Sequence, residues 1–276
     1  MHSFMTATGA RVPDVGAARM RELDRIATET FGLDLLQMME NAGRALADTV
    51  RGFLVGNGGV TIMAGPGGNG GGGLAAARHL HGWGIPVRIV LAQPEARSSR
   101  AAAHQLGILR AANVPVGGPD MADAWVAEAD VAIDALVGYG LGAPIEGETA
   151  DLIRTLNRRA RRIVSLDLPS GLDATHGVIG GAIVRPAGIL TLALPKTGLA
   201  DPTADLAELW LADIGIPPEA IRQLGITEYA SPFRGDARLS LRCTGTWSAR
   251  CREGAHTSHV PARAFAPAPG GGSGQG

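Results

Sequence analysis

The chain has 276 residues, of which 45% are hydrophobic and 18% charged, and its formal net charge is −1. This hydrophobic fraction is enough for a sizeable buried core, and the near-zero charge gives no field that would attract nucleic acid or an anionic membrane. The apolar runs are too short to cross a bilayer, the first residues lack a signal-peptide pattern and only two cysteines occur, so we expect a cytoplasmic enzyme without disulfides.

Two amphipathic helices are predicted before the first strand. Helical spacing relates the apolar residues of the first helix, which are Met20, Leu23, Ile26 and Ala27. Gly32 is placed to end it, and Asp34 to cap the second helix. The second helix has its own apolar face, made of Leu35, Met38, Met39, Ala42 and Leu46. Glu40 and Asn41 adjoin this face, so we expect them to reach the glycine loop or a partner subunit.

Residues 65–73 form a glycine-rich segment, Gly-Pro-Gly-Gly-Asn-Gly-Gly-Gly-Gly, between an apolar run and a helical pattern. A strand, a glycine loop and a helix start in this order favour phosphate binding, because glycine permits positive φ and close approach, and a helix N-terminus attracts anions. The alternative is a tight turn without a ligand. A phosphate loop is excluded since no Gly-Lys-Ser/Thr follows, and no clear acid ends the strand at 86–91, which argues against a hydride-transferring oxidoreductase.

Helices and strands alternate through the rest of the chain. The predicted helices cover residues 74–81, 98–109, 122–129 and 148–159, and the predicted strands 60–64, 86–91, 114–116, 130–134, 162–168, 189–194 and 209–213. This alternation predicts an α/β fold: a Rossmann-like, doubly wound, mostly parallel sheet with helices on both faces, in three αβα layers. The carboxyl ends of the strands then share one edge, where ligands bind.

Polar side chains follow three of these strands. Asn69, Asp134 and Ser170 are expected to converge at the ligand-binding edge, and their oxygen atoms suit a hard cation. Asp167 would lie beside them at the end of a buried strand, where desolvation can tune a carboxylate for proton transfer. Each of these residues alone could be a cap or a turn residue, but the set of three predicts a site.

Six ordered motifs together resemble the YjeF N-terminal domain family over about residues 20–217. They are MENAG at 39–43, GPGGNGGGGLAAARHL at 65–80, DALVGYGL at 134–141, LDLPSGLD at 166–173, ALPK at 193–196 and DIGIP at 213–217. The family includes the NAD(P)HX epimerases, which interconvert the R and S epimers of hydrated NADH and NADPH in cofactor repair. The domain is often fused to an NAD(P)HX dehydratase domain, which we do not expect in the residues after 217.

The resemblance also implies roles for individual residues. Potassium would be bound by Asn69, Asp134 and Ser170. The dinucleotide would contact Gly68, Asn69, Gly70, Gly71, Gly72, Gly138, Tyr139, Gly140, Leu141, Gly142, Ala143, Pro144 and Asp167. Asp167 is the acid/base candidate, and Lys196 would stabilise charge. The epimerising carbon bears a hydroxyl next to a ring nitrogen, so opening it by C–O or C–N cleavage needs proton transfer and charge stabilisation.

The chain departs from the family at two positions of the glycine segment. Gly68 and Gly72 stand where the family usually has asparagine and aspartate. Each lost buried partner typically costs about 1–3 kcal/mol, so weaker ligand binding is expected. A catalytically degenerate nucleotide-binding or interaction module of the same fold is therefore the alternative to an epimerase.

The last residues have a different composition from the rest of the chain. Gly, Pro, Ser and Ala dominate after about residue 230, which predicts a nucleotide-binding domain over residues 1–229 and a disordered tail over 230–276. The expected partners are NADHX or NADPHX as substrate, a second copy of the chain in a homodimer suggested by the resemblance, and a separate dehydratase that uses the product.

Overall fold

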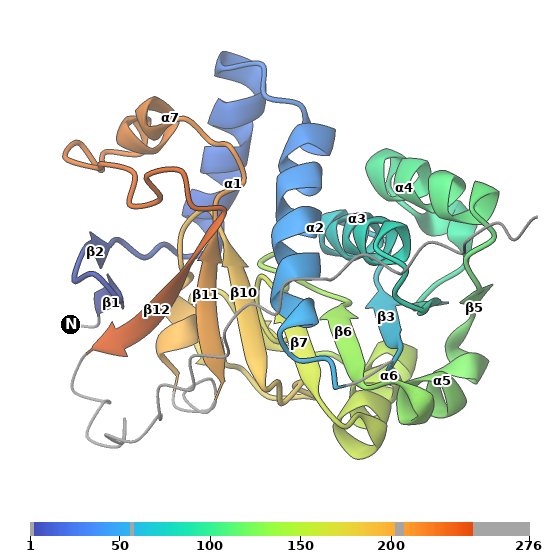
Figure 1. Cartoon of the computed structure of the whole chain (residues 1–276). Coiled ribbons are helices and arrows are strands. Elements are labelled where there is room, and N and C mark those ends of the chain that lie inside the picture. The colour runs from blue at the N-terminus through green and yellow to red at the C-terminus, as the bar shows by residue number, and fades with distance from the viewer. Residues whose placement is uncertain (1–2, 56–57, 202–206, 245–276) are drawn as a thin grey trace, which may run out of the picture.

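The computed structural model describes residues 3–55, 58–201 and 207–244. Its centre is a sheet in the order β2-β1-β12-β11-β10-β7-β6-β3-β4-β5 (Figure 1). In chain order, the strands of this sheet are β1 (Ser3–Thr6), β2 (Arg11–Val12), β3 (Val60–Ala64), β4 (Val87–Leu91), β5 (Val116–Gly117), β6 (Val131–Ala135), β7 (Ile163–Leu166), β10 (Gly188–Leu192), β11 (Glu208–Ala212) and β12 (Arg238–Thr244). The strands from β11 to β5 are parallel, and those from β12 to β2 are antiparallel. A separate small sheet pairs β8 (Leu172–Asp173) with β9 (Gly177–Val178).

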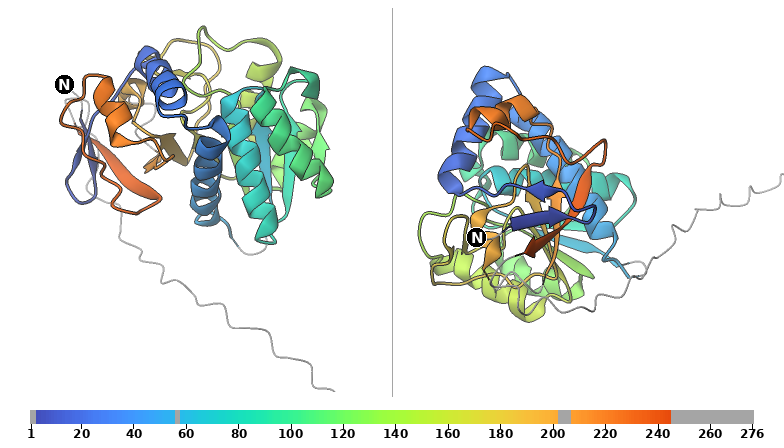
Figure 2. Two further views of the ribbon diagram at one scale, coloured as in Figure 1. Left: turned by 90° about the horizontal axis from the view of Figure 1, so that it is seen from above. Right: turned by 90° about the vertical axis from the view of Figure 1, so that its left-hand side faces the viewer.

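Helices cover both faces of the parallel part of the sheet. The helices are α1 (Ala17–Arg25), α2 (Leu35–Arg51), α3 (Gly68–Gly82), α4 (Arg100–Ala111), α5 (Ala122–Glu128), α6 (Gly147–Arg159) and α7 (Pro218–Gln223). Figure 2 shows α2, α3 and α4 side by side, and they contact one another in that order. Their core includes Ile62 and Ile133, whereas α5 and α6 pack on the other face with Met63 and Ala132. Successive strand residues thus point to opposite cores, and the predicted three-layer fold is confirmed.

The predicted ends of the first two helices are also confirmed. A π-helical turn, Ile26–Thr30, extends α1 before Gly32, whose φ is +67°. Asp34 caps α2 through a bond of 2.7 Å from the backbone N–H of Leu36, and Gln37 completes the capping box. In the described part of the chain, no helix combines the length and the apolar character that crossing a membrane requires.

The glycine-rich segment differs from the expected loop because α3 already begins at Gly68, and no glycine from 65 to 73 has a positive φ. These glycines serve close packing instead. A Cβ on Gly70 would lie 1.8 Å from the carbonyl oxygen of Gly65, and one on Gly73 would lie 2.5 Å from the Cβ of Ala135. Six glycines weaken a helix by about 1 kcal/mol each relative to alanine. They allow α3 to lie directly against the carboxyl edge of the sheet.

The predicted boundary after residue 229 is wrong. β12 pairs with both β1 and β11, and Phe233 and Leu241 are buried, so residues 230–244 belong to the domain. The alternation of Leu239, Leu241 and Cys243 with polar residues is the period-two signal of a strand, which the composition of the surrounding residues obscured. The expected disorder of residues 245–276 falls outside the described residues.

Candidate functional site

A cavity of about 700 Å³ opens at the carboxyl edge of the sheet, between α1, α2, the N-terminus of α3 and the ends of β7 and β10. One wall is apolar and consists of Met20, Leu35, Met38, Met39, Ala42 and Ile214. The other lining groups are polar and include Asp24, Asn69, Tyr139, Asp167 and Lys196. This size and this mixture of surfaces are typical of a small-molecule or cofactor site.

Two neighbouring strands end in strained turns beneath this cavity. Asp167, directly after β7, has φ = +69°, and the backbone N–H of Leu168 donates to the carbonyl of Leu166 at 2.9 Å. Ala193, directly after β10, has φ = +61°, and the N–H of Leu194 donates to the carbonyl of Leu192 at 2.7 Å. Three-residue turns with a positive φ are rare and costly, and such strain concentrates at functional sites. These turns place Asp167 and the carbonyl of Leu192 beside the cavity.

The Asp167 carboxylate is held by a charge and two backbone donors. Its Oδ1 forms an ion pair with Nζ of Lys196 and accepts from the N–H of Leu192 at 3.4 Å, and its Oδ2 accepts from the N–H of Tyr139 at 3.1 Å. The Lys196 side chain is 0% exposed, and its ammonium also donates to the Leu192 carbonyl at 2.8 Å. Lys196 is therefore the buried counter-charge of Asp167.

Asp24 is a residue of this site that the sequence reasoning missed. It lies on α1 and lines the cavity, and the hydroxyl of Tyr139 donates to its Oδ2. Burial raises the pKa of Asp24, opposed by the Tyr139 hydrogen bond and by the charge of Lys196. Burial and the Asp24 charge also raise the pKa of Tyr139 well above its usual range. The available signal was an acid four residues after Met20, on the apolar stripe of a helix.

Asp134 lies below the cavity, fully buried, on β6. Its carboxylate accepts hydrogen bonds from Ser165 Oγ at 2.7 Å, from Ser170 Oγ at 2.5 Å and from the N–H of Ser170 at 2.9 Å, and a longer one of 3.3 Å from the N–H of Leu136. All of these donors are neutral. Burial therefore raises the pKa of Asp134, against the effect of the hydrogen bonds.

Asn69 meets Asp167 across Gly138. A Cβ on Gly138 would lie 3.0 Å from both the Asn69 Oδ1 and the Asp167 Oδ2, so this position needs a glycine for the two side chains to approach. The Asn69 Nδ2 is buried and has no hydrogen-bond partner among the described residues. An unpartnered buried amide that faces a cavity is costly unless a ligand satisfies it.

The structure gathers only part of the predicted site around this cavity. Among the predicted residues, those in its wall are Gly68, Asn69, Gly72, Gly138, Tyr139, Gly140, Asp167 and Lys196. Others are elsewhere: Asp134 and Ser170 are buried beneath it, Gly70 and Gly71 pack inside the protein, Leu141 joins the core under α5 and α6, and Gly142, Ala143 and Pro144 are exposed on the loop beyond. This loop therefore does not line the cavity in the described conformation.

The donors near Asp134 suit a hard monovalent cation. The oxygen atoms of Asp134, Ser170 and the Val137 carbonyl lie within hydrogen-bonding distance of one another through Ser170 Oγ, which is 3.2 Å from that carbonyl. A fully buried carboxylate that only neutral groups contact gains from a cation. The residue types and the uncompensated charge thus fit a hard cation such as potassium.

Known proteins of similar sequence carry the same domain. The family model described as YjeF-related protein N-terminus matches residues 35–198. The NAD(P)H-hydrate epimerase of Dehalogenimonas lykanthroporepellens is 45% identical over 236 residues, which cover 83% of this chain and 93% of that protein. The NAD(P)H-hydrate epimerase of Truepera radiovictrix is 34% identical over 228 residues, 79% of this chain and 97% of that protein.

Two further relatives differ in length or in the kind of likeness. The bifunctional NAD(P)H-hydrate repair enzyme Nnr of Methanothermobacter thermautotrophicus is 39% identical over 204 residues, 71% of this chain but 39% of that protein. The crystal structure of the yeast protein ynu0 superposes with a TM-score of 0.72 at 24% identity and covers 83% of this chain and 100% of that one. The latter likeness concerns the fold alone.

Proposed function

This chain belongs to the family of YjeF-related protein N-termini, and we propose that it is an NAD(P)H-hydrate epimerase, an isomerase that interconverts the R and S epimers of hydrated NADH and NADPH. One observation carries the proposal besides the named relatives. A buried Asp167–Lys196 ion pair on a strained turn adjoins a cavity at the N-terminus of α3. This arrangement combines a proton-transfer group with a place for a phosphate-bearing ligand.

The cavity offers suitable surfaces to each part of a dinucleotide. Gly68 and Asn69 are the first residues of α3, and the N–H groups and the dipole at a helix start favour the pyrophosphate. Space beside Gly68 is open, since its added Cβ would meet nothing closer than Met39 Cε at 4.0 Å. The apolar wall from α1 and α2 suits the flat face of a ring.

The reaction requires that a bond at the carbon bearing the hydroxyl breaks and then forms again on the other face of this carbon. Asp167 would accept or donate the proton, and Lys196 supplies its counter-charge without touching the substrate. The N–H groups of Tyr139 and Leu192 fix the orientation of the carboxylate. Opening by C–O or by C–N cleavage uses the same groups.

Potassium is part of this proposal. Asn69, Asp134 and Ser170 would hold it. When bound, it would supply a positive charge beside the buried Asp134 carboxylate, which has only neutral hydrogen-bond donors around it. Anything that binds only the native state stabilises it, so potassium is expected to raise the melting temperature. Identical melting and binding curves in sodium and potassium would argue against a selective site.

The chain spans 39–41% of the bifunctional relatives. Since those proteins are named as combined repair enzymes, a separate dehydratase is the partner activity that we propose for this chain. The homodimer and the cytoplasmic location stay predictions.

The deciding experiment follows single epimers of NADHX and NADPHX by chromatography with purified protein, in potassium and in sodium. Wild type is expected to accelerate the approach to the epimer mixture well beyond the spontaneous rate, and the Asp167→Asn variant to lose this acceleration. Tight binding without any acceleration would instead support the non-catalytic nucleotide-binding module.

A further inference from the structure

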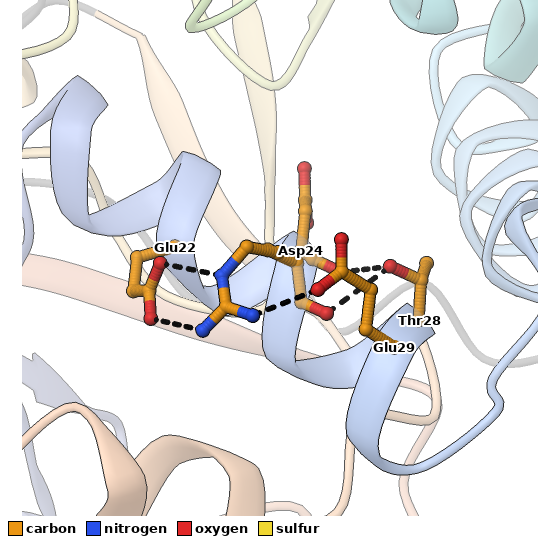
Figure 3. A network of polar contacts seen from close by, with 5 residues as sticks. Glu22, Asp24, Thr28 and Glu29 are labelled. Carbon is orange, nitrogen blue, oxygen red and sulfur yellow. Dashed lines mark hydrogen bonds and ion pairs between the residues drawn. The ribbon is translucent and has the colours of Figure 1, made fainter.

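Asp24 differs from the other acids of its helix in what it faces. Glu22 and Glu29 pair with Arg25 on the exposed side of α1 and the turn that follows, and Figure 3 shows the Asp24 side chain directed away from this network. Instead, Asp24 lines the cavity and bonds to Tyr139. Exposed pairs of this kind contribute little to stability. Asp24 therefore differs from Glu22 and Glu29 both in its surroundings and in its partner.

Tyr139 joins Asp24 to Asp167. Its hydroxyl donates to Oδ2 of Asp24, while its backbone N–H donates to Oδ2 of Asp167 at 3.1 Å. The two carboxyl groups are thus held apart by the length of one tyrosine side chain, one on α1 and the other at the end of β7. Oδ1 of Asp24 accepts no hydrogen bond from any residue that the structure describes, which leaves it for a ligand.

The two carboxyl groups have different surroundings. Asp167 contacts the ammonium of Lys196, whereas the Asp24 carboxyl group bonds to the neutral Tyr139 hydroxyl and forms no ion pair with any residue that the structure describes. Burial favours the neutral form of Asp24. A pair of acids in which one is matched by a cation and the other is not can divide the acid and base roles of a reaction.

We propose that Asp24 is the second proton-transfer residue of this site, which acts on the substrate from the α1 wall while Asp167 acts from the sheet edge. This inference rests on the proposed epimerase function. Two groups on different walls suit inversion, because the hydroxyl must leave one face of the ring carbon and return to the other. Tyr139 is a positioning residue that orients both carboxyl groups.

In C–O cleavage, Asp24 gives its proton to the substrate hydroxyl, the C–O bond breaks with its electron pair on the departing water, and the ring nitrogen lone pair forms a C=N bond. A water molecule then adds to the other face, its lone pair forms the new C–O bond, the C=N pair returns to nitrogen, and Asp167 takes the released proton. No atom is oxidised or reduced, and proton exchange with solvent restores both carboxyl groups.

The test compares Asp24→Asn with Glu22→Gln, which removes an acid from the exposed side of the same helix. Asp24→Asn keeps an acceptor for the Tyr139 hydroxyl but cannot transfer a proton. We expect kcat to fall at least about 100-fold, while dinucleotide affinity measured by calorimetry with NADP stays within about threefold of wild type. Glu22→Gln should leave both values unchanged.

Chemical rescue separates a catalytic from a structural role. In Asp24→Ala, added formate supplies a small acid to the space that the side chain leaves, and it should restore part of kcat in a concentration-dependent way. Formate should not affect Glu22→Gln. An Asp24→Ala enzyme that is inactive and insensitive to formate would contradict the proposal, as would an Asp24→Asn enzyme whose loss lies wholly in affinity.

The wild-type assay keeps this inference distinct from the proposed function. A wild-type chain that does not accelerate epimerisation overturns the proposed function, and this inference with it. An active wild type with an equally active Asp24→Asn variant overturns this inference alone.

Discussion

Asp134 and Asp167 end neighbouring strands of the same parallel sheet, yet their surroundings differ in every respect. Asp134 has regular strand geometry, is closed off from the cavity and bonds to neutral donors. Asp167 has a positive φ, contacts the cavity and pairs with a buried lysine. The position at a strand end therefore does not by itself set the surroundings of a carboxylate. The charge partner, the backbone strain and the access to the cavity distinguish Asp167, and we expect them to make it the reactive carboxylate.

The residues bonded to Asp134, here called the Asp134 cluster, support the residues around Asp167, here called the Asp167 cluster. Asp134 bonds to Ser165 on β7, to Leu136 in the segment that leads to Tyr139, and to Ser170 three residues after Asp167. It thereby fixes both segments that orient the Asp167 carboxylate. This comparison predicts that changes at Asp167 abolish chemistry, whereas changes at Asp134 mainly loosen the site.

The largest effect is expected for Asp167→Asn. Epimerisation should fall about 10²–10⁴-fold, since asparagine tolerates the positive φ and keeps one acceptor oxygen for the backbone donors but cannot exchange a proton. The free energy of unfolding should also fall by about 3–5 kcal/mol, because the Lys196 ammonium stays buried without its partner. Stopped chromatographic assays and urea unfolding measure the two effects. An unchanged rate would remove Asp167 from the mechanism.

A double variant separates the two consequences of that change. Asp167→Asn combined with Lys196→Met removes both buried charges, so most of the lost unfolding free energy should return. Activity should stay at the level of the Asp167→Asn single variant. If activity returned together with stability, the acid would have been only a structural partner of Lys196.

The corresponding change in the other cluster is Asp134→Asn. The NH2 group of this asparagine would point a donor at groups that now donate to Asp134, which are the Ser170 N–H and the two serine hydroxyls. The free energy of unfolding should therefore fall by about 1–3 kcal/mol. We expect a higher KM, a smaller change in kcat than at Asp167, and loss of any difference between potassium and sodium in melting experiments. If kcat fell as much in Asp134→Asn as in Asp167→Asn, the expected difference between a supporting Asp134 and a reactive Asp167 would be wrong.

Local patterns predicted the parallel part of the fold well. Apolar runs gave the strands from β3 to β11, and the polar residues that follow them led directly to Asp134, Asp167 and Ser170. Local patterns were insufficient where pairing joins distant segments. β12 pairs with β1 at the opposite end of the chain, in the register Leu241 to Thr6, and no local pattern shows that these two segments are partners.

The roles within the site also depended on tertiary contacts. Asp24 precedes its partner Tyr139 by 115 positions, so no spacing rule connects them. The family resemblance implied a charge role for Lys196, but its complete burial and its ion pair with Asp167 are visible only in the structure. The order of strand, glycines and helical pattern predicts a loop at these glycines, whereas α3 already begins at Gly68, and contacts of 2.5 Å or less at Gly70 and Gly73 explain why no larger residue fits there.

A smaller effect on stability is expected from Asp24, and it depends on pH. The pKa of Asp24 is raised in the folded state, so its contribution is fully present below the unfolded pKa, near 3.8, and is lost as the pH rises through the folded value. Asp24→Asn should therefore match wild type near pH 4 and exceed it at neutral pH, on the order of 1 kcal/mol, since Asp24 is only partly exposed. The groups that set this balance are Tyr139, Asp167 and Lys196. Melting curves across this pH range measure the effect, and a gain confined to low pH would contradict it.

The smallest effects are expected at two glycines of α3, one of which faces the cavity and the other β7. Gly68 faces the open cavity, so Gly68→Asn fits without displacing any neighbour, should stabilise the helix start by a few tenths of a kcal/mol and should tighten dinucleotide binding a few-fold. Gly72 faces β7, and a Cβ there would lie 2.8 Å from Leu166 Cδ2. Gly72→Asp therefore requires Leu166 to move and adds a second carboxylate beside Asp167, so we expect a loss of stability and no gain in binding. Melting curves and calorimetry with NADP on the two single variants check both expectations. If the Gly72→Asp variant bound NADP more tightly than the Gly68→Asn variant, the surface of α3 beside β7 would take part in ligand binding, and its description as closed packing would be wrong.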